Sequence, residues 1–119
     1  RFTAEYINDK KTDRYTAMVA DIKKIINSQY RTIENIDQVT AQIFMSTVHA
    51  NSVFKKETGQ TIFDYLTKVR MEKAKIMLAD KNSKVYKVSE NVGYKSKTYF
   101  TSLFREYTGM TPGEYRDKC

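Results

Sequence analysis

One pattern of residues occurs twice in this chain, with the second copy 50 positions after the first. The displacement pairs identical or similar residues, namely Ser46 with Ser96, His49 with Tyr99, Phe54 with Phe104, Lys55 with Arg105, Thr58 with Thr108 and Gly59 with Gly109. A repeat of this kind indicates one supersecondary unit that is built twice. Because 119 residues suffice for one domain, we expect both copies to share a single body.

Each copy has the pattern of a helix, a tight turn and a second helix. Ahead of each Ser, apolar residues recur at the three- and four-residue steps of a helix, as Ile36, Val39 and Ile43 and as Val85, Val88 and Val92. Asn35 is the expected N-cap of the first copy. Gly93 supplies a left-handed bend in the second turn. The first turn lacks glycine and is one residue shorter, so Phe44 or Met45 has to make its bend.

Further helices are predicted around the two copies. Beyond each closing glycine, a Thr is followed three residues later by an acid, as Thr61 with Asp64 and Thr111 with Glu114, which is typical of a capped helix start. An apolar stripe begins at Tyr15, whereas residues 1–14 have none and are expected to be a linker or the end of an upstream domain. With one Pro and four Gly, the chain is predicted to be all-α.

The expected organisation is therefore two helix-turn-helix units joined by a long linker helix. Within a domain of residues 15–119, the expected ranges are a first unit at about 35–58, a linker helix at about 61–80, a second unit at about 84–108 and a terminal helix at about 112–118. A linker helix of this size is roughly 28 Å long, comparable to the ~34 Å between successive major-groove faces of a duplex.

The second helix of each copy is predicted to have a buried and an exposed face. The side chains expected inside are Ala50, Val53 and Phe54, then Phe100, Leu103, Phe104 and Tyr107. Those expected outside are Val48, Asn51, Ser52 and Lys55, then Thr98, Thr101, Ser102 and Arg105. Short polar groups can bond base edges in the major groove, Val can touch a thymine methyl, and the cations suit phosphates. A plain solvated face is the alternative for one helix, but its recurrence in the same register favours DNA.

Charge favours the second copy as the stronger anchor. The chain has a formal net charge of +7, which suits a polyanion but does not identify one. Residues 84–110 carry five cations against two acids, whereas residues 33–60 carry two cations against three acids. Lys97, in the first turn of its helix, is the preferred guanine contact, with a phosphate contact as the alternative.

The sequence disfavours catalysis, metal binding and a membrane span. His49 is the one histidine, Cys119 is the one cysteine, and there is no Gly-rich phosphate loop or paired metal-ligand spacing. We read His49 as a packing or phosphate-facing residue. No enzyme activity, metal or cofactor is expected, no apolar run approaches the ~20 residues of a membrane span, and a reducing cytoplasm is the expected location.

The combined motifs resemble those of the AraC/XylS family of bacterial transcription regulators. The residues that carry the resemblance are Ser46, Phe54 to Gly59, Met71 to Ala74, Val92 to Tyr94, Tyr99-Phe100 and Gly109 to Arg116. The likeness covers roughly residues 17 to 117 and is strongest toward the YesN-like response regulators. It implies a domain of about seven helices that places two recognition helices in adjacent major-groove segments of double-stranded DNA.

The resemblance also implies residue roles and partners. The family's base-reading positions fall on Val48, Asn51, Ser52, Lys97, Thr98 and Ser102, and the face derived above adds Thr101. The expected phosphate contacts are Ser46, Lys55, Ser96 and Arg105. Activation through RNA polymerase, under control of a missing N-terminal receiver or ligand-binding domain, is implied, and homodimerisation through that domain is compatible with it. Thr40, Ser89 and Ala50 depart from the family pattern; Thr40 and Ser89 are expected to bond back to a helix carbonyl, and Ala50 to thin the first core.

One alternative is a helical protein-interaction or RNA-binding module. Specific binding to duplex DNA with a steep salt dependence distinguishes the DNA reading from that alternative.

Overall fold

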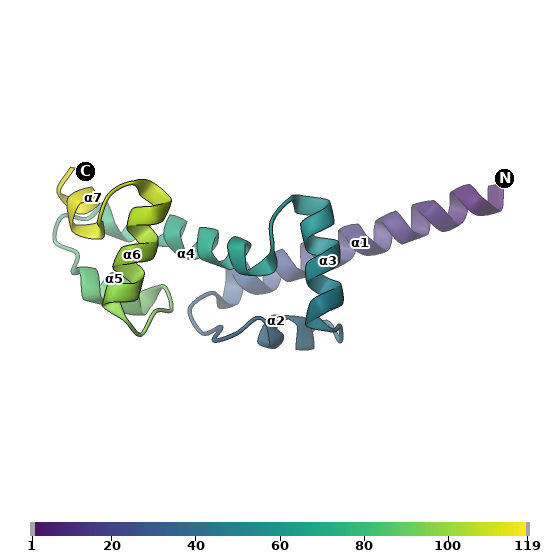
Figure 1. The fold of residues 1–119 in the computed structure, drawn as a ribbon, viewed down its shortest axis with the longest axis horizontal. Coiled ribbons are helices and arrows are strands. Elements are labelled where there is room, and N and C mark those ends of the chain that lie inside the picture. The colour runs from purple at the N-terminus through teal and green to yellow at the C-terminus, as the bar shows by residue number, and fades with distance from the viewer. Residues whose placement is uncertain (1, 119) are drawn as a thin grey trace. The chain divides into compact units, whose positions relative to one another are not determined.

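The computed structural model describes the backbone of residues 2–118 and the side chains of residues 14–118. Within that part the fold is all-α, as predicted, and Figure 1 shows its seven helices in order. They are α1 (Phe2–Gln29), α2 (Asp37–Ala41), α3 (Thr47–Thr58), α4 (Ile62–Leu78), α5 (Val85–Asn91), α6 (Lys97–Thr108) and α7 (Pro112–Lys118). None of the helices described is both long and apolar enough to cross a membrane. Cys119 lies outside the described residues.

The chain forms two compact units, each containing one helix-turn-helix. Unit 1 consists of residues up to 28 together with 34–65, and unit 2 consists of residues 29–33 together with those from 66 onward. Helix α4 contributes its first turn to unit 1 and the remainder to unit 2. In unit 1 α2 packs on α3, and in unit 2 α5 packs on α6, which also contacts α7.

The core of unit 1 gathers aliphatic side chains around the aromatic pair of Phe54 and Tyr65. Its buried members include Val19, Ile22 and Ile26 of α1, Val39 of α2, Ala50, Val53 and Phe54 of α3, and Ile62 of α4. Phe54 meets Tyr65 edge to face at 5.7 Å between ring centroids. The Tyr65 hydroxyl accepts a hydrogen bond from Asn27 at 3.1 Å, and Lys23 lies over the same ring. These contacts hold α1 against the start of α4.

The core of unit 2 is built on a continuous run of aromatic rings. Ring centroids lie 5.8 Å apart from Tyr94 to Phe100, 5.8 Å from Phe100 to Phe104, and 5.5 Å from Phe104 to Tyr115. Phe100 and Phe104 are fully buried, and aromatic pairs in this distance range stabilise a core beyond their buried area. Where unit 2 has Phe100, unit 1 has the much smaller Ala50, so the aromatic run has no counterpart there.

A buried arginine fixes residues 30–33, which follow α1, to the turn of unit 2. Arg70 is only 7% exposed and donates from Nε to the Tyr30 carbonyl at 2.9 Å and from Nη2 to the Ile33 carbonyl at 2.6 Å. Its guanidinium also lies 4.9 Å from the centre of the Tyr94 ring. Burial raises the pKa of the Tyr94 phenol although Arg70 opposes the change. Burying a cation is costly unless it is compensated, and these carbonyls and this ring provide compensation for Arg70.

Two expectations about the extent and burial of the helices are wrong. Helix α1 begins at Phe2 instead of Tyr15, because residues 2–14 contain neither Pro nor Gly and extending a helix costs far less than starting one. Whether residues 1–14 are a linker or the end of an upstream domain stays a prediction. Tyr107 was expected inside but is 41% exposed, because its hydroxyl donates to the Glu72 carboxylate at 3.0 Å and so keeps a polar partner.

Candidate nucleic-acid interface

The same hydrogen bonds fix both ends of the recognition helices α3 and α6. Ser46 caps α3 by accepting from the His49 N–H at 3.2 Å, and Ser96 caps α6 by accepting from the Tyr99 N–H at 3.1 Å. Gly59 and Gly109 end the two helices in the left-handed conformation. The repeat seen in the sequence is therefore a repeat of capping geometry.

The helices that follow the recognition helices begin in the same way. Thr61 and Asp64 form a reciprocal capping box at α4, with 3.0 Å and 3.3 Å bonds. Thr111 and Glu114 do so at α7, with 3.2 Å and 2.9 Å bonds. Both boxes confirm the predicted helix starts. The Thr111 N–H lowers the pKa of the exposed Glu114 carboxyl.

The turns of the two units follow one backbone path with different residues. The Met45 N–H donates to the Thr40 carbonyl at 3.2 Å, and the Tyr94 N–H donates to the Ser89 carbonyl at 3.0 Å. Just before these residues, Phe44 has φ 56° and Gly93 has φ 105°. Phe44 is therefore the residue that makes the left-handed bend in the first turn, where unit 2 has glycine. Its side chain is 95% exposed.

Glycine at position 93 is required by its surroundings. A Cβ there would lie 2.8 Å from Arg70 Nη2 and 2.9 Å from the Tyr30 carbonyl oxygen, both closer than van der Waals contact. Phe44 carries a Cβ in its turn at the cost of a backbone conformation that residues with a Cβ disfavour.

In unit 1, hydroxyl groups beside the recognition helix are bonded internally. The Thr47 hydroxyl donates to the Asp37 carboxylate and lies 2.8 Å from the Thr40 hydroxyl. Thr40 also bonds back to the Asp37 carbonyl at 3.4 Å, as predicted. The same prediction is wrong for Ser89, which reaches forward to the Tyr94 carbonyl at 3.3 Å, because that carbonyl lies across the turn. The repeat pairs Thr47 with Lys97, which is exposed.

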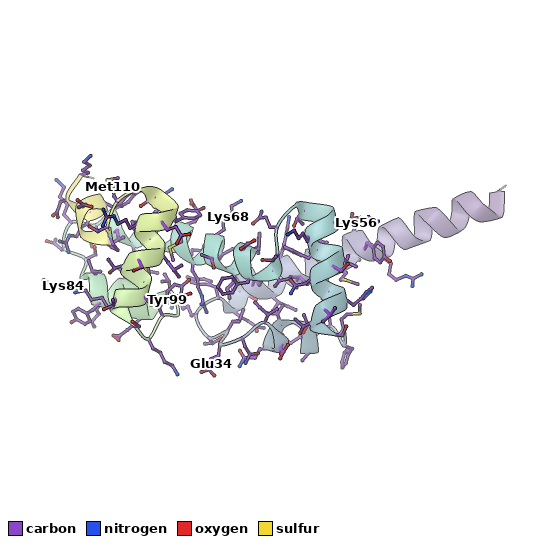
Figure 2. The ribbon with its side chains drawn as sticks, in the orientation of Figure 1. Glu34, Lys56, Lys68, Lys84, Tyr99 and Met110 are labelled. Carbon is purple, nitrogen blue, oxygen red and sulfur yellow. The ribbon has the colours of Figure 1, made fainter. Side chains whose placement is uncertain are left out.

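The predicted contact residues are displayed on both recognition helices. Val48 is 82% exposed, and the other side chains of the predicted set that are exposed are Ser46, Ser52, Lys55, Ser96, Lys97, Thr98, Ser102 and Arg105. Asn51 and Thr101 are half-buried. In Figure 2 the side chains of Lys56 and Tyr99 mark α3 and α6. His49 is exposed as well, which agrees with the phosphate-facing reading better than with packing.

Asn51 has a structural bond that the sequence analysis missed. Its Oδ1 accepts from the Ile62 N–H at 3.0 Å, so it satisfies one of the free donors at the start of α4. The repeat pairs Asn51 with Thr101 and Ile62 with Pro112. Pro112 has no N–H, so position 101 has no such donor to satisfy. The proline at the start of the terminal helix was the signal that marked this difference.

The bond to Ile62 orients the amide of Asn51. Releasing Oδ1 would leave the N–H of Ile62, a residue with 0% exposure, without its partner, at a cost of about 1–3 kcal/mol. An amide oxygen has two lone pairs, so Oδ1 can keep this bond and accept a second one. Bidentate recognition of adenine uses both the oxygen and the nitrogen of an amide, and the bond to Ile62 does not exclude it.

Four cations of unit 2 besides Lys97 surround its recognition helix. Lys84, Lys87, Lys95 and Arg105 are all exposed. The described side chains include no cluster of three or more His, Cys, Asp or Glu that is arranged to hold a metal. The chemistry on display is that of hydroxyls, cations and apolar groups on two helices of matching geometry.

Comparison with known proteins places this arrangement in a family. A family model described as a helix-turn-helix domain matches residues 39–118. The C-terminal domain of the two-component response regulator YesN from Fusobacterium nucleatum is 33% identical, covers 80% of this chain and 93% of that one, and superposes with a TM-score of 0.76. The C-terminal domain of the response regulator AraT from Geobacillus stearothermophilus is 27% identical, covers 86% and 85%, and has a TM-score of 0.82.

The curated relatives are longer proteins. The HTH-type transcriptional activator Btr from Bacillus subtilis is 33% identical over 98% of this chain, which corresponds to 22% of its own length. The chain spans 14% to 45% of the length of four other curated relatives. The family model matches about two thirds of the chain, and the neighbours share both helix-turn-helix units. The chain belongs to the AraC/XylS family of helix-turn-helix DNA-binding domains.

Proposed function

We propose that this chain is the part of a transcription regulator that binds double-stranded DNA in a sequence-specific manner. The observation that carries the proposal is the repeated display of small polar and cationic side chains on α3 and α6, each held by the same serine cap and glycine end. The N-terminal residues of a recognition helix are those that reach base edges in the major groove.

The proposed contacts follow from exposure and chemistry. Base contacts are assigned to Val48, Asn51, Ser52, Lys97, Thr98, Thr101 and Ser102. Phosphate contacts are assigned to Ser46, Lys55, Ser96 and Arg105. The serine caps accept a backbone N–H with their oxygen, and the hydroxyl hydrogen remains able to donate to a phosphate.

The wider role of the protein is proposed from its relatives. Activation of transcription by contact with RNA polymerase, control by an N-terminal receiver or ligand-binding domain, dimerisation through that domain and a cytoplasmic location all belong to this proposal. Support comes from YesN and AraT, which are response regulators, and from Btr, which is a transcriptional activator. Removal of the upstream domain from the full-length protein and assay of its promoter tests the control.

DNA binding is tested by selection from a library of random duplexes with the purified chain. We expect enrichment of one sequence and a binding constant that falls steeply as salt rises. Lys97→Ala or Arg105→Ala should weaken binding more than Ser52→Ala, and loss of a phosphate contact should reduce the logarithmic salt slope by about one. The proposal is contradicted if no duplex is enriched, or if the chain binds only single-stranded RNA or protein. Equal losses of affinity in all three variants contradict the prediction that unit 2 contributes more to DNA binding than unit 1.

A further inference from the structure

The recognition helix of unit 1 differs from that of unit 2 in which of its side chains are bonded within the unit. Its polar side chains at positions 47 and 51 are bonded within the unit, to Asp37 and to the Ile62 N–H. Two apolar side chains next to them, at positions 44 and 48, are strongly exposed, at 95% and 82%. Thr47 and Asn51 are thus half-buried and bonded, while Phe44 and Val48 lie exposed beside the polar side chains of Ser46, His49 and Ser52.

Phe44 is the more exposed of the two apolar side chains. Its backbone adopts φ 56°, a region that residues with a Cβ disfavour, and nearly all of its ring is exposed. Neither feature stabilises the folded chain. Strained backbone held together with an exposed aromatic ring is characteristic of a contact surface.

The positions of Phe44 and Val48 indicate which group of the duplex they contact. Phe44 lies two residues before the N-cap Ser46, and Val48 is the second residue of α3. The first turn of a recognition helix is the part that meets base edges in the major groove. The one strongly apolar feature on those edges is the C5-methyl group of thymine.

We infer that unit 1 reads thymine methyl groups through the exposed apolar side chains of Phe44 and Val48, which lie close in sequence to the hydrogen-bonding groups of Asn51 and Ser52. This inference rests on the proposed function, since it specifies what the recognition helix of unit 1 contacts in the duplex. Unit 2 supplies the contrast, because it has Gly93 at the position of Phe44 and Thr98 at that of Val48, and its Lys97 is exposed. Methyl contacts of this kind then belong to unit 1, and unit 2 has the larger number of cations around its recognition helix.

The test replaces thymines by deoxyuridine, which removes the methyl and leaves every hydrogen-bonding group in place. The duplex enriched from the random library is synthesised with each thymine changed in turn, and affinity is measured with the purified chain. We expect a loss of about three- to fivefold at one or more thymines, the size of one buried methyl contact. In Val48→Ala and in Phe44→Gly, the loss at the thymine touched by that side chain should disappear.

Two further measurements separate this contact from an effect on folding. Phe44→Gly relieves the left-handed strain, so it should raise the denaturation midpoint while it lowers the affinity for the thymine duplex about three- to fivefold. Lys97→Ala should weaken binding to thymine and deoxyuridine duplexes equally, because its contact does not involve a methyl. Val48→Thr, which keeps the shape of the side chain, should retain part of the sensitivity.

The outcomes distinguish failure of the thymine-methyl inference from failure of the proposed function. Enrichment of a duplex without any deoxyuridine penalty overturns the inference and leaves the proposed function intact. A penalty that persists unchanged in both Val48→Ala and Phe44→Gly also overturns it. If Phe44→Gly is more stable and binds every duplex as tightly as the native chain, Phe44 has another partner and its part of the surface is refuted. Failure to enrich any duplex is instead a failure of the proposed function.

Discussion

Units 1 and 2 share one backbone plan and differ in where their polar side chains are used. At the start of the helix after the recognition helix, unit 1 has an N–H that needs a partner, at Ile62, and takes it from Asn51. Unit 2 has Pro112 there, which needs none. At the first position of the recognition helix, unit 1 has Thr47, bonded to Asp37, whereas unit 2 has the exposed Lys97.

The difference shows that a duplicated fold fixes the place of a recognition helix but not the chemistry that the helix offers. Some polar side chains of unit 1 are bonded within the unit and stabilise its fold. Unit 2 obtains stability from an aromatic run and from Arg70, so the hydroxyls and cations on α6 remain outward. Variants that give one unit the residues of the other test whether this difference between the units is real.

The largest effect is expected at Gly93. Gly93→Ala places a Cβ 2.9 Å from the Tyr30 carbonyl oxygen and 2.8 Å from Arg70 Nη2, in a left-handed conformation. Strain and overpacking together should lower the free energy of unfolding by about 2–4 kcal/mol. Chemical denaturation of the variant measures the loss.

Gly59 is the matched control for Gly93, since it is left-handed with φ 79° but has no atom within 4 Å of an added Cβ. Gly59→Ala should therefore cost only about 1 kcal/mol. If the two variants lose the same stability, the close packing of Arg70 against the second turn is not what requires glycine there, and the contrast with Phe44 has to be explained otherwise.

The next effect concerns the bond between Asn51 and Ile62. Asn51→Thr, which copies Thr101, should cost about 1–3 kcal/mol because a buried N–H loses its acceptor. In an Ile62→Pro background, which copies Pro112 at a helix position that accepts proline, the same change should cost almost nothing. Denaturation of the four proteins gives the coupling energy between the two positions.

Ser52 provides the control for this cycle, because it is exposed on the same helix. Ser52→Ala should have the same small effect in both backgrounds. A cost for Asn51→Thr that is equal with Ile62 and with Pro at position 62 would show that Asn51 acts on stability by some route other than this hydrogen bond.

The sequence predicts local structure in this chain better than it predicts contacts between helices. The caps at Ser46 and Ser96 and the two capping boxes are defined by residues three positions apart, and the structure confirms them. The Asn35 side chain accepts from the Gln38 N–H at 3.2 Å, but the N-cap residue of α2 is Ile36, so the predicted cap lies one residue too early. The bond from Ile62 to Asn51 joins positions 11 apart in different helices, which no periodicity reveals. The helix over residues 2–14 was missed for a related reason, because a helix is extended by the absence of breakers as well as by an apolar stripe.

The candidate site was predicted as a set of exposed positions, and for most of them exposure is what the structure displays. What the pattern did not reveal is which polar groups are already bonded, since Asn51 and Ser52 look equivalent on a helical wheel. The exposed ring of Phe44 was also missed as a contact residue, although the lack of glycine in its turn identified the bend.

The smallest expected effect is the pH dependence of the α7 capping box. The Thr111 N–H, which donates to Glu114 at 2.9 Å, holds the pKa of that carboxyl below its ordinary value of 4.5. A carboxyl with a lowered pKa stabilises the fold above the ordinary value, and the contribution is lost as pH falls through the lowered one. Glu114→Gln keeps an acceptor but cannot titrate, so its denaturation midpoint should fall less than that of the native chain between about pH 6 and about pH 3. Glu90→Gln, which removes an exposed carboxyl from α5, gives the change due to charge alone. If both variants behave alike, the capping box of unit 2 adds no acid sensitivity of its own, and the pair of Ile62 and Pro112 remains the difference between the α4 and α7 starts that affects stability.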